Sequence, residues 1–161
     1  MTIAVGDTIP EADVRIMRDG LPVVVPITQI IGTGRAVLFA VPGAFTPTCH
    51  RQHLPGFVDQ AAALAGKGVD TVACLSVNDV FVMDSWGEVS GVGDAIVMVA
   101  DPDAEFTRAV GMDVDVSKGG LGIRSKRYAM VVEDGVVTAF LPEPDGFGLA
   151  DSSAQCVLDV L

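Results

Sequence analysis

The sequence predicts a single α/β domain that spans residues 1–161, with a central mixed β-sheet flanked by helices on both faces. From residue 37 onward, short apolar runs alternate with helical patterns, which is typical of parallel strands joined by crossover helices. Further along, two β-rich runs are joined by Asp134-Gly135, a strong signal for an antiparallel hairpin. A chain of 161 residues can bury one core without disulfides, and no Gly-, Ser- or Pro-rich tract divides it.

The first elements follow from apolar runs and one proline. Residues 37–41, 69–77 and 95–101 are short apolar runs, and we expect them to form buried strands of the sheet. The segment from residue 49 to about residue 65 has a helical pattern. We expect Pro55 to kink that helix, because a proline inside a helix removes one backbone hydrogen bond.

Two further helices carry clear end signals. One follows the second strand and has Asn78 or Asp79 as its N-cap, since both side chains can accept a hydrogen bond from a first-turn N–H. The other has Asp101 as its cap, Pro102 at its first helical position and Gly111 at its end.

The C-terminal part combines a β-hairpin with a helix. Residues 127–141 hold the two β-rich runs, and residues 152–161 form a short helix capped by Ser152 or Ser153. The apolar stripe of that helix consists of Ala154, Val157, Leu158 and Leu161. Cys156 lies outside this stripe and is therefore not expected to face the core. This order of elements is compatible with a thioredoxin-like fold, and several other α/β folds remain possible on pattern alone.

The composition excludes several kinds of partner. The net charge is −11 and the ten Lys and Arg residues are scattered, which argues against nucleic acid and anionic membranes. No apolar run is long enough to cross a bilayer, and the N-terminus does not resemble a signal peptide, so we expect a cytoplasmic location. The three cysteines include no CxxC pair and are expected to be thiols in a reducing compartment.

The stretch "VPGAFTPTCHRQHLP", residues 41–55, is the strongest candidate for chemistry. Pro42 and Pro47 restrict the loop, and Thr46 or Thr48 could cap the helix that Cys49 enters. A thiol in a first helical turn faces unpaired N–H groups and the positive end of the helix dipole, which favour the nucleophilic thiolate. The alternative is a small buried hydrophobic residue. The hydroxyls on both sides and the lack of apolar periodicity favour a reactive thiol.

The only histidines, His50 and His53, lie directly after Cys49. Because Cys49 and His53 are four residues apart, they share a helix face, which raises a metal site or a nucleophile–base pair as alternatives. The metal site lacks further Cys or His ligands, and the hydrolase arrangement lacks an orienting Asn or Asp. We therefore expect His53 to pack at the edge of the site and His50 to face solvent.

Several segments together resemble one family of enzymes. The loop "PGAFTPTC", followed by "HLPGF", resembles the active-site loop of peroxiredoxins, in particular the type-five or plant type-II subgroup. The similarity extends over nearly the whole chain and continues in "CLSVNDVFVMDSWG", "DPDAEFTRAVGM" and "GLGIRSKRYAMVVEDG". It implies a thioredoxin-like fold and a thiol peroxidase that uses no metal, haem, flavin or other cofactor.

The resemblance also implies roles for individual residues of the loop. Cys49 is the expected nucleophile, which becomes a sulfenic acid. Thr46 would hold the attacked peroxide through its hydroxyl, and Pro42 would shield the thiolate from solvent. Thr48 and Phe45 are candidate substrate-binding residues, the former because backbone N–H groups near it could donate to the peroxide.

The family also uses a distant arginine, and the segment "GIRSKRY" places Arg124 in that role. Its guanidinium would favour the thiolate and stabilise charge that develops on the peroxide oxygens. Lys126 and Arg127 are expected to be solvated charges at the start of a strand.

The route back from sulfenic acid to thiol is less determined. Animal relatives carry a resolving cysteine in a C-terminal loop, where this chain has Asp151. Cys74, in an apolar strand, is expected in the core, with a resolving role as the alternative. Cys156 is the other candidate resolving thiol, although nothing places it near Cys49. We expect an external thiol to reduce Cys49, either glutathione with glutaredoxin or thioredoxin.

The expected activity is reduction of hydrogen peroxide and alkyl hydroperoxides in antioxidant defence and redox homeostasis. The resemblance further implies a homodimer formed through a face near the active-site loop, to which Phe45, Phe81 and Trp86 could contribute, with core packing as the alternative for each. Two other functions remain open: a non-enzymatic thiol redox sensor, which would react without rapid turnover, and a cysteine acyl hydrolase.

Overall fold

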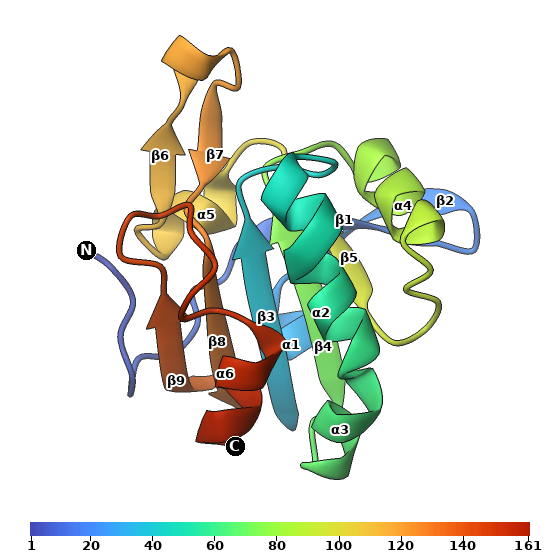
Figure 1. The fold of residues 1–161 in the computed structure, drawn as a ribbon, viewed down its shortest axis with the longest axis vertical. Helices are drawn as coiled ribbons and strands as arrows, with labels where there is room; N and C mark the ends of the chain where they lie inside the picture. Colours follow the sequence, from blue (N-terminus) through green and yellow to red (C-terminus); the bar gives the residue numbers. More distant parts are fainter.

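The computed structural model describes all 161 residues and is built around a seven-stranded mixed sheet in the order β2-β1-β5-β4-β3-β8-β9 (Figure 1). Strands β3, β4 and β5 run parallel, and the other neighbours pair antiparallel. The sheet strands are β1 (Asp13–Arg18), β2 (Leu21–Pro26), β3 (Arg35–Val41), β4 (Thr71–Ser76), β5 (Val97–Ala100), β8 (Tyr128–Glu133) and β9 (Val136–Pro142). The short strands β6 (Asp113–Asp115) and β7 (Ile123–Ser125) form a separate hairpin that projects beyond one end of the sheet (Figure 1).

Helices cover both faces of the sheet, as predicted. One face is covered by α2 (Leu54–Asp59), α3 (Ala61–Gly66), α4 (Val80–Val89) and α6 (Ala154–Val160), and the other by α1 (Thr28–Ile31) and α5 (Glu105–Ala109) (Figure 1). A single turn of 3-10 helix, η2 (Ser117–Gly119), lies at the tip of the projecting hairpin. No helix is both long enough and apolar enough to cross a membrane.

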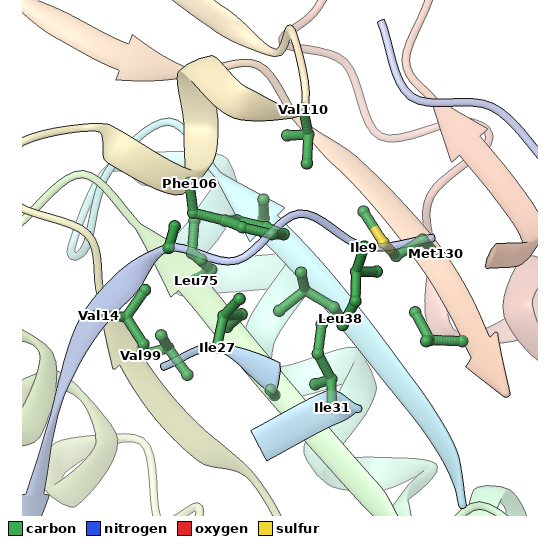
Figure 2. Close-up of a cluster of buried hydrophobic side chains, with 14 of the residues drawn as sticks. Ile9, Val14, Ile27, Ile31, Leu38, Leu75, Val99, Phe106, Val110 and Met130 are labelled. Atoms are coloured by element: carbon green, nitrogen blue, oxygen red, sulfur yellow. The ribbon is translucent and has the colours of Figure 1, made fainter. Parts of the chain in front are cut away.

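The central strand β3 shows why the sheet is buried on both sides. Its residues Ala36, Leu38 and Ala40 point into one apolar cluster, where Figure 2 shows Leu38 beside side chains from α1 and α5. The alternate residues Val37, Phe39 and Val41 belong to a second cluster, which also contains Cys49 and Cys74. A strand of continuous apolar residues is therefore what this position requires.

The predicted strands and the predicted hairpin are confirmed. The three apolar runs form β3, β4 and β5, and Asp134-Gly135 joins β8 to β9 with φ values of 46° and 82°. The same signal occurs at Asp19-Gly20, with φ values of 51° and 75°, and it joins β1 to β2. That first hairpin was not predicted, nor were α1 and the β6–β7 hairpin.

The predicted helix from residue 49 to residue 65 is corrected in its details. It begins with a π-helical turn, η1 (Cys49–His53), in which the Leu54 N–H donates to the carbonyl of Cys49. Pro55 closely follows this π-helical turn, inside a helical run that extends without interruption from residue 47 to residue 59, so the distortion expected at the proline takes the form of a wider turn just before it. A second irregularity falls at Gln60, between α2 and α3.

Two of the predicted caps are confirmed and one boundary changes. Asp79 caps α4 through the Val82 N–H, and Ser153 caps α6 through the Cys156 N–H. The Asp101 carboxylate accepts hydrogen bonds from the N–H groups of Glu105 and Thr107, but α5 begins only at Glu105. Ala104 intervenes with a left-handed φ of 55°, so Pro102 lies in a turn before the helix rather than at its first position.

Candidate active site

The candidate site lies at the C-terminal end of β3. The chain leaves the sheet at Val41, passes through a loop and becomes helical at Pro47. Cys49 therefore lies in the first helical turn, as predicted. Cys49 is fully buried, in contact with the apolar cluster on the α2 face of the sheet. A thiol in this place is shielded from bulk water while it remains next to the polar loop.

Hydrogen bonds inside the loop fix its shape. The Thr46 hydroxyl donates to the carbonyl oxygen of Gly43 at 2.7 Å, and the Ala44 N–H donates to Asn78 Oδ1 at 3.0 Å. Asn78 Oδ1 also accepts from the Ser76 hydroxyl at 2.7 Å. Asn78 therefore anchors the active-site loop to the end of β4, a role that its prediction as a helix cap did not include.

The two loop threonines do not cap the helix. No side-chain cap bond is present at Thr48, and the Thr46 hydroxyl oxygen receives no N–H from the first helical turn, while its proton is donated to Gly43. Because the single O–H of Thr46 is already donated, its oxygen can act toward a ligand only as a hydrogen-bond acceptor. The prediction that either threonine supplies a cap is therefore wrong.

Arg127 is the cation at the thiol. Its Nη2 donates to Cys49 Sγ at 3.2 Å, its Nη1 donates to His53 Nδ1 at 2.9 Å, and its Nε donates to the carbonyl oxygen of Phe147 at 3.1 Å. The side chain of Arg127 is almost completely buried, with 2% of the residue exposed. The bond places a permanent positive charge directly against the sulfur, in a site from which water is excluded.

The choice of Arg124 for this role is corrected. Arg124 does not contact Cys49; its Nη1 donates to the carbonyl of Pro42 at 3.3 Å and its Nε to the carbonyl of Leu121 at 2.8 Å. Arg127, expected to be solvated, is the residue that immediately precedes β8. Since Tyr128 pairs with Ala40 of β3, Arg127 lies at the end of β3 from which the active-site loop departs.

His53 is buried at the site, and both of its ring nitrogens are engaged. An arginine can only donate, so Nδ1 accepts from Arg127 and the Nε2–H donates to the carbonyl of Ser152 at 2.9 Å. Burial, with the nearby Arg127 charge, lowers the pKa of His53 to about 3. His53 is thus a neutral partner of Arg127 and has no free nitrogen to deprotonate Cys49 or to bind a metal.

His50 lies on the other side of the turn and is half-buried rather than fully solvated. Its Nδ1 accepts a hydrogen bond from Trp86 Nε1 at 3.1 Å, and the Phe45 ring lies 5.7 Å from its ring. Phe45 has a left-handed φ of 64° and is 46% exposed at the tip of the loop. Trp86 is fully buried, so core packing describes it better than an exposed face, whereas Phe81 is exposed.

The segment that covers Arg127 is held by a buried carboxylate. Glu143 Oε1 accepts from the N–H groups of Ala150, Asp151 and Ser152 and from the Ser152 hydroxyl. Burial alone would raise the pKa of Glu143, but these donors outweigh it and lower the pKa. The carbonyl of Ser152, which receives the His53 proton, is thereby kept in place.

The three cysteines are separate thiols. Cys74 is fully buried in β4, as expected, and burial together with the proximity of Cys49 raises its pKa well above the ordinary value. Cys156 is partly exposed on α6, and its sulfur accepts from the Ser153 hydroxyl at 3.1 Å. Asp151 occupies the C-terminal segment next to Ser152 and is exposed. No group of three or more His, Cys, Asp or Glu side chains is arranged to hold a metal.

Comparison with known proteins identifies the family. A family model described as Redoxin matches residues 4–158. The chain is 47% identical to Peroxiredoxin-2E-2, chloroplastic, of Oryza sativa subsp. japonica, over 99% of this chain and 73% of that protein. It is 39% identical to Peroxiredoxin-2B of Arabidopsis thaliana, over 99% of this chain and 98% of that protein.

The solved structures agree with the sequence relatives. Reduced Prx3 of Vibrio vulnificus, in complex with hydrogen peroxide, superposes with a TM-score of 0.92 at 43% identity, covering 98% of each chain. Peroxiredoxin 5 of Alvinella pompejana superposes with a TM-score of 0.86 at 34% identity, over 98% of this chain and 97% of that one. The thioredoxin-like fold is confirmed by this likeness. The chain therefore belongs to the Redoxin family and is a peroxiredoxin of the type II subgroup, a thiol peroxidase.

Proposed function

We propose that Cys49 reduces hydrogen peroxide and small alkyl hydroperoxides and is then regenerated by an external thiol. The observation that carries the proposal is the bond from Arg127 Nη2 to the buried Cys49 Sγ. This bond places a permanent positive charge where a thiolate and a polarised peroxide would both be stabilised. Neither an acylation base nor a metal site accompanies it, because both nitrogens of His53 are engaged.

The proposed chemistry is a two-electron displacement. The Cys49 thiolate forms a bond to one peroxide oxygen, the O–O bond breaks, and the other oxygen leaves as water or alcohol after taking up a proton. The sulfur is oxidised to a sulfenic acid and the peroxide is reduced. Arg127 would stabilise the negative charge that spreads from sulfur to the departing oxygen.

The loop residues have matching roles in this proposal. The Thr46 oxygen, whose proton is used on Gly43, would accept the O–H of the bound peroxide. Backbone N–H groups near Thr48 and Cys49 would donate to the peroxide oxygens, and buried Pro42 would exclude water. Phe45, held at the loop tip with a left-handed φ, would border the entrance.

An external reductant is supported by the positions of the other thiols. Cys74 is sealed in the core, Cys156 is bonded within α6, and Asp151 replaces the resolving cysteine that the family resemblance led us to look for. Glutathione with glutaredoxin, or thioredoxin, would supply the second thiol. Because Cys49 is buried, the turn η1 has to open locally before such a partner can reach the oxidised sulfur.

Two further features belong to the proposal. A homodimer would use the exposed Phe45 and Phe81 near the active-site loop, while Trp86 stays in the core. A cytoplasmic location is consistent with the three free thiols, which suit a reducing compartment.

The first experiment is intact mass spectrometry of the reduced protein after one equivalent of hydrogen peroxide, without reducing agent. We expect one added oxygen, which is lost in Cys49→Ser and kept in Cys74→Ser and Cys156→Ser. A mass loss of two hydrogens would contradict the external-thiol route, and the variant that prevents the loss would name the resolving cysteine. Sustained turnover with glutathione and glutaredoxin, or with thioredoxin, would exclude the sensor function, which predicts a single stoichiometric reaction.

A further inference from the structure

Arg124 forms no hydrogen bond to the Cys49 sulfur, yet it is not a free surface charge. The residue is half-buried, and its guanidinium bonds in two directions. Nε donates to the carbonyl of Leu121 inside the projecting hairpin, and Nη1 donates to the carbonyl of Pro42 in the active-site loop. One side chain thus joins two segments that are far apart in the sequence.

Gly43 shows how closely Arg124 approaches the loop. A Cβ at Gly43 would lie 2.9 Å from Arg124 Nη1 and 3.0 Å from Thr46 Cγ2. Both distances are too short for a side chain to fit without displacing its neighbours. An added Cβ at position 43 would therefore push against both the guanidinium of Arg124 and the methyl group of Thr46.

Two consecutive carbonyl groups of the loop are held by different residues. The Pro42 carbonyl accepts from Arg124, and the Gly43 carbonyl accepts from both the hydroxyl and the N–H of Thr46. The place of the Thr46 oxygen depends on the Gly43 carbonyl, and the orientation of that carbonyl depends on the Pro42–Gly43 segment. A shift of Arg124 would thus be transmitted to the oxygen that is proposed to receive the peroxide.

We infer that Arg124 is a positioning residue of the peroxidase site, which holds the Pro42–Gly43 segment so that the Thr46 oxygen faces the peroxide. It also couples that loop to the β6–β7 hairpin, whose three-residue strands pair Asp113 with Ser125 and Val114 with Arg124. The hairpin forms its own small sheet outside the main one, and the Arg124 side chain connects it to the active-site loop. The inference rests on the proposed role of Thr46 in peroxide binding.

The test compares two reactions of Cys49 in Arg124→Met and Arg124→Lys. Methionine keeps much of the length but removes every donor, whereas lysine keeps the charge and can still reach one carbonyl. One reaction is oxidation by hydrogen peroxide in stopped flow, followed through the fluorescence of Trp86, the only tryptophan. The other is alkylation by iodoacetamide, which needs the thiolate but not the peroxide contacts. Lys118→Ala removes an exposed charge from the same hairpin and is the matched control.

We expect Arg124→Met to slow the peroxide reaction about tenfold, the effect of losing one charge-assisted hydrogen bond. Alkylation should stay within about twofold of the wild-type rate, because Arg127 still contacts the sulfur. Arg124→Lys should recover part of the peroxide rate, and Lys118→Ala should react like the wild type.

Three results would count against the inference. An unchanged peroxide rate in Arg124→Met would overturn it, as would an equal loss in both reactions, because that would mean an effect on the thiol itself. A peroxide rate in Arg124→Lys as low as in Arg124→Met, with both variants folded by thermal unfolding, would also overturn it. If the wild-type protein itself does not reduce peroxide, the proposed function is wrong, and the inference about Arg124, which rests on it, is wrong with it.

Discussion

Replacement of Arg127 by lysine tests the geometry of the site most directly. The guanidinium serves three acceptors at once, Cys49 Sγ at 3.2 Å, His53 Nδ1 at 2.9 Å and the Phe147 carbonyl at 3.1 Å. A lysine ammonium keeps the charge but is a compact group that cannot span these three positions. Arg127→Lys therefore separates the effect of the charge from that of the placed donors.

The expected loss follows from the donor that is removed. Loss of one preorganised donor to developing charge lowers catalytic rates by roughly 10²–10³-fold, or about 3–4 kcal/mol. We expect Arg127→Lys to lose about 100-fold in the second-order rate constant for oxidation of Cys49, near the lower end of that range, because the positive charge remains.

The assay is stopped-flow fluorescence of Trp86, whose Nε1 donates to His50 in the turn that carries Cys49. Arg51→Lys makes the same chemical change at an exposed position of that turn and serves as the control. If Arg127→Lys oxidises as fast as Arg51→Lys, the placed guanidinium does not stabilise the reaction and the argument from the Arg127–Cys49 contact fails.

Three further predictions concern stability and the loop. Since the pKa of His53 is lowered to about 3, the unfolded state binds more protons between about pH 3 and pH 6.5, and stability must fall as the pH drops through that window. Urea unfolding should show about 2 kcal/mol lost between pH 7 and pH 5 from this group, and a His53→Gln variant with an equally steep loss would contradict the assignment. Glu143→Gln should lower the free energy of unfolding by about 1–3 kcal/mol in the same measurement, because an amide has only one oxygen to accept the hydrogen bonds that the carboxylate accepts from Asp151 and Ser152. An unchanged urea midpoint would show that these bonds do not stabilise the fold. Gly43→Ala should slow the peroxide reaction about tenfold, by displacing Arg124 and Thr46, and a wild-type rate would mean that the loop tolerates the added Cβ.

Local features of the fold were readable from short stretches of sequence. The hairpin at Asp134-Gly135, the cap at Asp79 and the apolar strands follow from interactions among residues close together in the chain, so local chemistry was sufficient to predict them. The same chemistry was present at Asp19-Gly20, where the hairpin between β1 and β2 was overlooked. The position of Cys49 at the entrance to a helix is local as well, and was predicted correctly.

The identity of the arginine at the thiol was decided by tertiary structure. Arg124 and Arg127 are separated by only two residues, and their local sequences do not distinguish them. The antiparallel register of β8 against β3 brings Arg127 to the end of β3, while Arg124 pairs within the separate β6–β7 hairpin. Strand register is set by contacts between distant segments, so the short pattern "GIRSKRY" could not reveal it.

The order of apolar and helical patterns and the loop sequence by themselves predicted an α/β fold with a cysteine at a helix entrance, and both are confirmed. Tertiary structure alone decided which groups surround that cysteine: Arg127 from the start of β8, His53 from the next turn of its own helix, and the Ser152 carbonyl from a segment held by Glu143. The physical reason is that a local pattern specifies how a segment folds, whereas a reactive site is assembled by the packing that brings separate segments together.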